Sequence, residues 1–257
     1  MTDVVIVGSG NVAEAFASAV ARCEGLRLAG IYARNRECGA ELALRLGTTY
    51  SDRELMPAKV YIIAVSDRAV EEVAHALPFP REALVLHTAG SIPMEAIPER
   101  EGGRGIIYPL QSFSRGRDVE LSGVPLFIEA DSDEHRVEIE RVALLLSSRV
   151  EYAASHRRRV IHLAGVFVNN FVNHLYSLGS EILASEGLDF SLLEPLIRET
   201  ADKAIASGSP QSVQTGPAVR GDSIVTAAHM ELLAEDKLKS DIYRAITKSI
   251  WETSKRI

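Results

Sequence analysis

The sequence has 257 residues, with 28 Lys and Arg against 35 Asp and Glu, so its formal net charge is −7. Hydrophobic residues make up 46% and charged residues 25%, which is ordinary for a folded protein and excludes a collagen-like or disordered chain. An acidic chain lacks the overall attraction to phosphate backbones that non-specific nucleic-acid binders use, so we expect no nucleic-acid partner. The two cysteines, Cys23 and Cys38, suit a reducing compartment better than a disulfide framework.

Targeting and membrane signals are also missing from the sequence pattern. No basic region followed by a long apolar run opens the chain, so we expect no signal peptide. The apolar stretch 160–168 contains His162 and is far shorter than the roughly 20 residues of a membrane span. No group of His, Asp and Glu has the spacing of a metal site. We therefore expect a soluble cytoplasmic protein with no membrane partner and no metal.

Short apolar runs alternate with helical stretches in the first part of the chain. The predicted strands are 4–7, 26–32, 59–65, 84–87, 105–108, 125–129 and 149–152. The predicted helices between them are 11–22, 36–46, 68–77 and 134–147. This alternation predicts βαβ units, and hence an α/β fold with a doubly wound, mostly parallel Rossmann sheet.

The pattern changes near residue 153, after which no β-rich run appears. The predicted helices are 155–186, 190–207, 223–234 and 237–255, with a loop rich in Gly and Pro at 208–221. We therefore expect a dinucleotide-binding domain over 1–153 and an all-α domain over 154–257. The substrate is expected between the two.

A glycine-rich turn follows the first predicted strand and opens the first helix. Its pattern, Gly8-x-Gly10-x-x-Ala13, is the dinucleotide fingerprint with Ala in the third position. Gly8 permits a tight turn and Gly10 lets the backbone approach a diphosphate, which the N-terminus of the helix attracts. The expected contacts are Gly8, Ser9, Gly10, Asn11 and Val12. The alternative is a turn of an α/β protein that binds no phosphate.

The end of the second predicted strand bears on which dinucleotide binds. NAD sites carry an acidic residue there for the ribose 2′-OH, whereas NADP sites place Arg nearby for the 2′-phosphate. This chain has Arg34, Asn35 and Arg36, and no carboxylate before Glu37. The two guanidinium groups favour NADP over NAD, and the missing carboxylate counts against a methyltransferase that uses S-adenosylmethionine. The alternative is that both arginines are solvated.

Two further strand ends are expected at the same edge of the sheet, where ligands of open α/β sheets bind. The first is Val65, Ser66 and Asp67, and the second starts at His87 and Thr88. Asp67 could contact the cofactor or cap the next helix. His87 could exchange a proton with a substrate, because the histidine pKa lies near neutral pH. The alternative is that its ring only forms hydrogen bonds with the backbone.

Four longer motifs complete a resemblance to a known family. They are HTAGS at 87–91, YPLQSFS at 108–114, FVNNFVNH at 167–174 and TGPAVRGD at 215–222. With the glycine turn, they make the chain resemble bacterial Rossmann-type NADP oxidoreductases that carry a helical C-terminal domain. These proteins are similar to the superfamily of 6-phosphogluconate dehydrogenase, 3-hydroxyisobutyrate dehydrogenase and pyrroline-5-carboxylate reductase, and they are sometimes grouped with deazaflavin-dependent NADP reductases. The resemblance implies two domains and a homodimer formed through the C-terminal helices.

The chain departs from this superfamily at one catalytic position. The β-hydroxyacid dehydrogenases place a catalytic Lys on the long helix, but this chain has no Lys between Lys59 and Lys203. At 100° per residue, His162, Asn169 and Asn173 fall within about 40° of one another on that helix, and Asn170 lies about 80° from His162. They could line a substrate site, or form a hydrogen-bond network in a core or dimer interface.

The expected site residues can now be stated together. The candidates for catalysis are His87, His162 and Asn170, and the candidates for substrate contacts are Gln111, Asn169, Asn173 and Arg220. Arg220 could clamp a carboxylate or phosphate, whereas Asp222 is expected to cap the helix that follows. The function predicted from these residues is NADP-dependent hydride transfer to or from a small polar substrate. The alternative is a dinucleotide-binding sensor that has lost turnover, since the superfamily Lys is missing.

Overall fold

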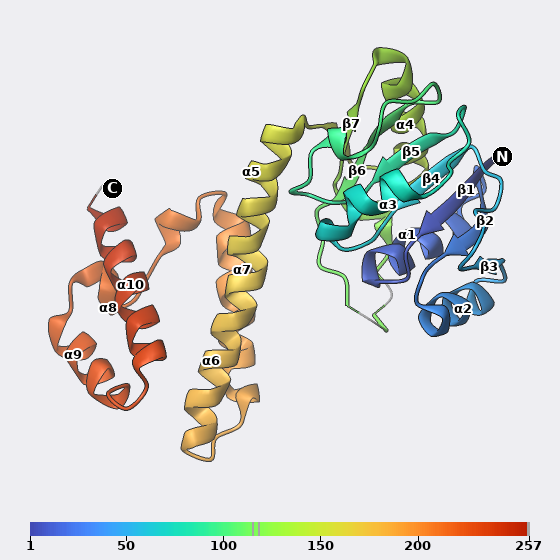
Figure 1. Cartoon of the computed structure of the whole chain (residues 1–257). Helices are drawn as coiled ribbons and strands as arrows, with labels where there is room; N and C mark the ends of the chain where they lie inside the picture. Colours follow the sequence, from blue (N-terminus) through green and yellow to red (C-terminus); the bar gives the residue numbers. More distant parts are fainter. Residues whose placement is uncertain (115, 118, 256–257) are drawn as a thin grey trace. The chain divides into compact units, whose positions relative to one another are not determined.

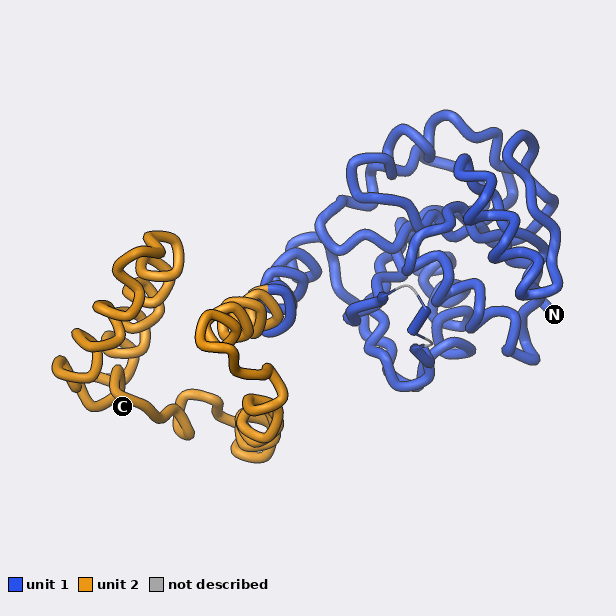
Figure 2. Tube along the Cα trace, turned by 90° about the horizontal axis from the view of Figure 1, so that it is seen from below, with its two compact units in different colours: residues 1–170 blue, residues 171–257 orange. Residues whose placement is uncertain are grey.

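A computed structural model describes residues 1–114, 116–117 and 119–255 of the chain. These residues form two compact units, Met1–Asn170 and Phe171–Ile257, which we call unit 1 and unit 2 (Figure 1, Figure 2). The sheet ends at residue 152, next to the boundary predicted at 153, whereas unit 1 continues along the following helix to Asn170.

Unit 1 is built on one eight-stranded sheet with the order β3-β2-β1-β4-β5-β6-β7-β8. Its strands are β1 (Thr2–Val7), β2 (Leu26–Tyr32), β3 (Tyr50–Ser51), β4 (Val60–Ile63), β5 (Leu84–His87), β6 (Arg104–Pro109), β7 (Leu126–Ala130) and β8 (Val150–Tyr152). All neighbouring pairs are parallel except β6 and β7. The chain builds outward from β1 to β3 and then returns to place β4 on the other side of β1, so the switch point for ligand binding lies between β1 and β4.

Helices cover both faces of this sheet. They are α1 (Asn11–Arg22), α2 (Arg36–Arg45), α3 (Val70–Ala76) and α4 (Asp133–Leu146), with short 3₁₀ turns η1 (Asp67–Ala69), η2 (Met94–Ala96) and η3 (Leu121–Gly123). Val4 and Ile6 of β1 pack in one core with Phe16 of α1, and Val5 packs in a second core with Ala74 of α3. Because both faces are covered, the strand is continuously apolar.

A long helical stretch follows the sheet and contains a change of helical type. It consists of α5 (Ser155–Gly165), the π-helical segment η4 (Val166–Phe171) and α6 (Val172–Ser185). The sequence predicts a single helix here. A π-helical turn closes i→i+5 hydrogen bonds and is therefore wider than an α-helical one, so each residue advances by less than the 100° assumed from the sequence. Side chains on either side of η4 are accordingly turned relative to that expectation.

Unit 2 consists of helices with little buried surface. It holds α6, η5 (Phe190–Leu193), α7 (Glu194–Ser207), η6 (Pro210–Val213), α8 (Pro217–Arg220), α9 (Ser223–Leu232) and α10 (Lys237–Ser254). Among the described residues of this unit, only Leu178, Ala218 and Ser240 are buried. By contrast, Leu196, Ile205 and other large apolar side chains are exposed.

The predicted fold class is confirmed, and most predicted elements lie within a few residues of the observed ones. The two-residue strand β3 was not predicted, and the loop predicted at 208–221 contains the short helices η6 and α8. Over the residues that the structure describes, none of the helices combines the length and the apolar character that crossing a membrane requires.

Candidate functional site

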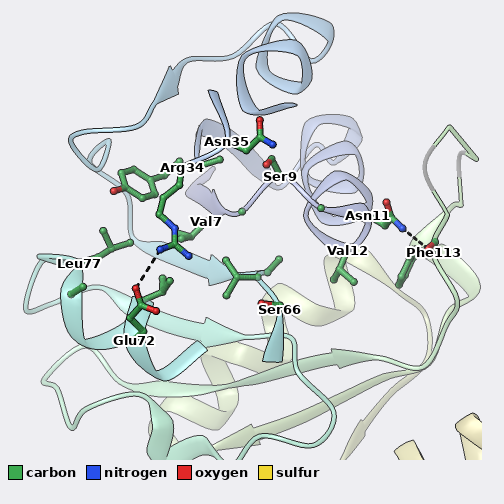
Figure 3. Close-up of a pocket in the computed structure, with 18 of the residues that line it drawn as sticks. Val7, Ser9, Asn11, Val12, Arg34, Asn35, Ser66, Glu72, Leu77 and Phe113 are labelled. Carbon is green, nitrogen blue, oxygen red and sulfur yellow. Dashed lines mark hydrogen bonds and ion pairs between the residues drawn. The ribbon is translucent and has the colours of Figure 1, made fainter. Parts of the chain in front are cut away.

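A cavity of about 660 Å³ opens at the carboxyl ends of β1, β2 and β4, at the switch point of the sheet (Figure 3). We call it the glycine-turn cavity. Of the predicted cofactor contacts, it is lined by Gly8, Ser9, Gly10, Asn11, Val12, Arg34, Asn35, Val65 and Ser66. Residues from three βα units therefore meet in one pocket, as the fingerprint predicts.

The glycine turn has the geometry that a diphosphate needs. Gly8 has a φ of +135°, and a Cβ there would lie 2.2 Å from the carbonyl oxygen of Ala64, so a side chain does not fit. Gly10 is different, because a Cβ there would have no heavy atom within 4 Å and would stand in open space. Gly10 is also the N-cap of α1, and no described side chain caps this helix end. The backbone N–H groups of the first turn are thus available to an anion.

Arg34 and Glu72 form the end of the cavity beside β2 and α3. Arg34 Nη1 lies 3.3 Å from Glu72 Oε1, and both side chains line the cavity (Figure 3). They are 70% and 66% exposed, so the pair contributes at most about 1 kcal/mol and opens readily. Asn35 caps α2, with its Oδ1 accepting the Cys38 N–H at 3.1 Å. An exposed guanidinium at this end of a dinucleotide cavity fits a 2′-phosphate.

The segment after β6 closes the cavity on the side of α1. Asn11 Nδ2 donates to the carbonyl oxygen of Phe113 at 2.9 Å, and the Phe113 side chain lines the cavity (Figure 3). Gln111, two residues earlier, also lines it. This contact spans 102 positions of sequence and ties the fingerprint helix to the YPLQSFS motif.

A second cavity, of about 640 Å³, lies within unit 1 and shares Gln111 with the first. We call it the His162 cavity. Its polar lining is Tyr108, Gln111, Ser112, His162, Asn169 and Asn170, and the rest is apolar. No lysine, arginine, aspartate or glutamate is among the described residues that line it. A cavity of this kind suits a mainly apolar ligand that carries a few uncharged polar groups.

The π-helical segment explains why both asparagines line this cavity. A regular helix would place Asn170 about 80° from His162. The structure instead brings His162, Asn169 and Asn170 to one cavity, because the wider turns of η4 rotate the chain less per residue. π-Helical turns of this kind are frequent at functional sites.

Tyr108 and His162 are in contact inside this cavity. The Tyr108 hydroxyl lies 3.1 Å from His162 Nδ1, and the two rings meet edge to face with centroids 5.9 Å apart. Tyr108 is 8% exposed, and burial raises the pKa of its hydroxyl, with a smaller raising effect from Asp67 and an opposing one from Arg158. Tyr108 therefore carries its proton at neutral pH.

Comparisons with known proteins agree with this geometry. Residues 3–90 match the family model described as "NADP oxidoreductase coenzyme F420-dependent", and residues 124–250 match the "Domain of unknown function (DUF2520)". The crystal structure of the "putative NADP oxidoreductase BF3122" from Bacteroides fragilis is 39% identical over 98% of both chains, with a TM-score of 0.90. The chain belongs to this NADP oxidoreductase family.

Two more distant structures share the fold of this chain. Protein TM1727 from Thermotoga maritima is 24% identical, with a TM-score of 0.82 over 98% of this chain and 99% of that one. The reductive aminase from Aspergillus terreus, crystallised with NADPH and ethyl-5-oxohexanoate, is 14% identical, with a TM-score of 0.71 over 100% of this chain and 94% of that one. No curated protein matches the sequence. At the level of the family, the cofactor predicted from the sequence, NADP(H), is confirmed.

Three predicted cofactor contacts do not line the glycine-turn cavity. Arg36 is exposed as the first residue of α2. Asp67 accepts a hydrogen bond from the Ser91 hydroxyl. Thr88 is buried, with its Oγ1 bonded to the carbonyl oxygen of Ile63 at 3.4 Å. For Asp67 and Thr88 the structure shows bonds that hold neighbouring strand ends together.

For His87 the structure favours the alternative, in which its ring only forms hydrogen bonds with the backbone. Its side chain is fully buried, Nδ1 accepts the Ala89 N–H at 3.1 Å, and Nε2 lies 3.3 Å from the carbonyl oxygen of Pro93. Because Nδ1 accepts, Nε2 carries the proton and the ring is held in one neutral tautomer. Burial lowers its pKa to about 4. A general acid at neutral pH needs access to the substrate and a proton that it can give up, whereas the Nε2 proton of His87 faces the Pro93 carbonyl oxygen and the ring is buried.

Asn173 and Arg220 belong to unit 2 and line neither cavity described above. Asn173 follows η4 by two residues and lies in α6. Arg220 ends α8. The predicted cap of the next helix is confirmed, since Asp222 Oδ1 accepts the Val225 N–H at 3.1 Å.

Several residues that line the two cavities were not predicted from the sequence, among them Glu72 and Tyr108. Glu72 comes from α3, 38 positions after its partner Arg34, and no local pattern indicates this contact. Tyr108 lies near the end of β6, and the rule that singled out the ends of the neighbouring strands would have found it. Among the described residues, no group of three or more side chains has the geometry of a metal site.

Proposed function

We propose that this oxidoreductase transfers hydride between NADP(H) and a small uncharged carbonyl or imine compound in the His162 cavity. One observation carries the proposal: Gln111 lines both the glycine-turn cavity and the His162 cavity, so the two cavities lie next to each other at this residue. Asp67 immediately follows Ser66, which lines the first cavity, and its charge acts on Tyr108, which lines the second. A cofactor in one cavity and a substrate in the other would therefore be neighbours.

The uncharged lining of the His162 cavity supports this choice of substrate class. A bound carboxylate or phosphate is held best by a charged partner, because burying an unpaired charge is costly. Gln111, Asn169 and Asn170 instead offer amide donors and acceptors, which match a carbonyl, hydroxyl or imine. The reductive aminase crystallised with ethyl-5-oxohexanoate, an uncharged keto ester, shares this fold.

The residues of this chain would bind and orient both reactants. When bound, NADPH supplies the hydride. The glycine turn and the N-terminus of α1 would hold the diphosphate, and Arg34 would hold the 2′-phosphate after releasing Glu72. The polar end of the His162 cavity would orient the C=O or C=N group and supply a proton, as predicted for His162.

The test is a panel of paired substrates with NADPH, followed by loss of absorbance at 340 nm. Ethyl levulinate is paired with levulinate, and 2-methyl-1-pyrroline with 1-pyrroline-2-carboxylate; oxidised coenzyme F420, named in the family description, is a separate acceptor. We expect the neutral member of a pair to be reduced with the larger kcat/KM. Faster reduction of the anions would contradict the substrate class. Tight NADPH binding with no oxidation by any compound would contradict the enzymatic function and favour the sensor.

We also propose that the chain forms a homodimer through its helices. Unit 2 has only three buried residues among those described, although helical units of this length normally enclose a core. Exposed Ile182 of α6, and Leu196 and Ile205 of α7, would be covered by a second copy. Light scattering of the wild-type protein should give twice the chain mass. Leu196→Glu should lower that measured mass. Glu199→Gln, a polar change on the same helix, is the control and should leave it unchanged. A monomeric wild-type protein would contradict the proposal.

A further inference from the structure

We propose that Tyr108 is the catalytic acid of this oxidoreductase, and that His162 returns a proton to it through Nδ1. The inference rests on the proposed function and adds the identity of the proton donor. Both side chains line the His162 cavity, and their polar atoms are 3.1 Å apart. Tyr108 was not among the catalytic residues predicted from sequence.

The backbone at Gly90 is shaped to let this pair form. A Cβ at Gly90 would lie 2.8 Å from His162 Nδ1 and 2.8 Å from the Tyr108 ring. Real Cβ atoms essentially never approach other atoms so closely, so one of the two rings would have to move. Gly90 has no positive φ, and a turn does not require glycine there. The space that its missing side chain leaves is taken up by the two rings.

A buried ion pair fixes the helix that carries His162. Arg158 lies one helical turn before His162, on the same face of α5. Its guanidinium is fully buried and bonds the carboxylate of Glu129 on β7 and the carbonyl oxygen of Ile92. Ser155 Oγ, at the start of α5, donates to Glu129 Oε2 at 3.0 Å. The first turn of α5 is therefore held against β7 and the 88–93 loop, which sets the position of His162 over Tyr108.

The charges around Tyr108 explain why it needs a partner. Burial and the nearby carboxylate of Asp67 raise the pKa of Tyr108, so the tyrosine is fully protonated at neutral pH but forms a tyrosinate reluctantly. Transfer of its proton to a substrate becomes favourable when a second proton replaces it at once. His162 is half-buried and lies beside that oxygen, so it can accept a proton from water at Nε2 and pass one on at Nδ1.

Reduction of the substrate adds one hydride and one proton to it. The substrate carbon receives a hydride, and the π electrons of the C=O or C=N bond move to its oxygen or nitrogen. That atom takes the proton of the Tyr108 hydroxyl. The Tyr108 oxygen then takes the proton from His162 Nδ1, and Nε2 takes one from a water molecule, which leaves as hydroxide into bulk solvent. Both side chains end neutral, and proton exchange with solvent returns His162 to its Nδ1–H tautomer before the next turnover. The oxidation reaction runs through the same groups in reverse.

This sequence of transfers requires one tautomer of His162. Nδ1–H must donate to the Tyr108 oxygen, which leaves the Tyr108 O–H free to donate into the cavity. Nitrogen-15 NMR of histidine side chains in the ligand-free protein tests this without any turnover, with His162→Asn used to assign the signal. We expect a protonated Nδ1 on His162 at pH 8, and a mixture of tautomers in Tyr108→Phe. An unprotonated Nδ1 in the wild-type protein would overturn the assignment of donor and acceptor.

The activity test uses 2-methyl-1-pyrroline and ethyl levulinate as probes. General acids contribute about 10²- to 10⁴-fold, so Tyr108→Phe should lower kcat at least about 100-fold, with the NADPH Kd within twofold of wild type. His162→Ala should lose kcat rather than raise KM, and added imidazole should restore part of it. If the wild-type enzyme reduces a probe and the kcat of Tyr108→Phe stays within about fivefold of the wild-type value, the role of Tyr108 is overturned while the proposed function stands. A wild-type enzyme inactive with every probe would overturn the proposed function, and the inference with it.

Discussion

Arg158, the middle residue of three consecutive arginines, forms a buried ion pair with Glu129 across the junction between α5 and β7. A run of consecutive arginines in a helix is usually a solvated face, but Arg158 departs from that pattern. Its side chain is fully buried and Glu129 is 9% exposed at the side chain, while Arg157 and Arg159 remain exposed. On a helix packed on one side only, every third or fourth residue turns inward, so one arginine of three faces the protein.

Removing the buried guanidinium should destabilise unit 1 strongly. Arg158→Met leaves the Glu129 carboxylate buried without its partner, and loss of one member of such a pair costs about 3–5 kcal/mol. Arg159→Met is the matched control, because Arg159 is exposed and its loss should stay within about 0.5 kcal/mol. Urea unfolding of both variants measures the difference. Equal stability of the two would mean that the Glu129–Arg158 pair does not hold α5 in solution.

Arg34 should determine the preference for NADPH over NADH. Its guanidinium lines the glycine-turn cavity, whereas Arg36 does not, so Arg34→Ala should weaken NADPH binding about 10- to 100-fold, as expected for a charge-assisted bond. NADH binding should change little. Arg36→Ala is the control and should affect both cofactors less. Equal losses of NADPH and NADH affinity in Arg34→Ala would contradict the assignment of the 2′-phosphate contact.

Glu72 should oppose NADPH binding. Its carboxylate holds Arg34 and would repel a 2′-phosphate. Glu72→Gln removes the charge at nearly constant shape, so it should tighten NADPH binding a few-fold, by about 1 kcal/mol or less for such an exposed pair, and leave NADH unchanged. Isothermal titration measures both. Weaker NADPH binding in this variant would show that the carboxylate contributes to the site instead.

A methyl group at Gly90 should separate Tyr108 from His162. Gly90→Ala places a Cβ within 2.8 Å of both rings, so it should reduce turnover while leaving NADPH affinity nearly unchanged, because Gly90 does not line the glycine-turn cavity. Gly123→Ala is the control, since its Cβ would meet no atom within 4 Å. Unchanged turnover in Gly90→Ala would argue that contact between the two rings is not needed.

The buried His87 should make the protein lose stability in mild acid. Burial lowers its pKa to about 4 in the folded state, against about 6.5 in the unfolded chain. Below pH 6.5 the unfolded chain therefore binds a proton that the folded protein does not. The contribution of His87 to the free energy of unfolding is therefore largest above pH 6.5 and decreases toward pH 4. The decrease is at most about 1.4 kcal/mol per pH unit.

The comparison that isolates this effect is His87→Gln, in which no group titrates at this position. Urea unfolding at several values from pH 7 to pH 4 should show a steeper loss of stability in the wild-type protein than in the variant. Parallel curves would mean that His87 is protonated in the folded protein, which would reopen a role for it as an acid.

The sequence predicted the parts of the site that depend on local chemistry. Gly8 and Gly10 were identifiable because a turn that approaches a phosphate excludes side chains, and Arg34 because it follows the second strand directly. The fold followed from apolar runs such as 4–7, which only a sheet covered on both faces tolerates.

The parts that could not be predicted depend on tertiary packing. No sequence period shows that Glu72 reaches Arg34 across two βα units. The grouping of Asn170 with His162 depends on η4, and a π-helical turn has no sequence signal that a 3.6-residue period would reveal. The role of His87 depended on whether its ring is buried and bonded to backbone, and the residue type alone is compatible with both interpretations.

The most direct test of the account is NADPH titration of wild type, Gly10→Ala and Gly8→Ala, with unfolding measured on each. A methyl group on Gly10 enters open space at the start of α1, so this variant should keep its stability and lose at least about tenfold in NADPH affinity through the displaced diphosphate. Gly8→Ala should lose stability itself, because its Cβ meets the Ala64 carbonyl. Undiminished NADPH binding by a stable Gly10→Ala, or no NADPH binding by the wild-type protein, would contradict the claim that this turn holds the cofactor.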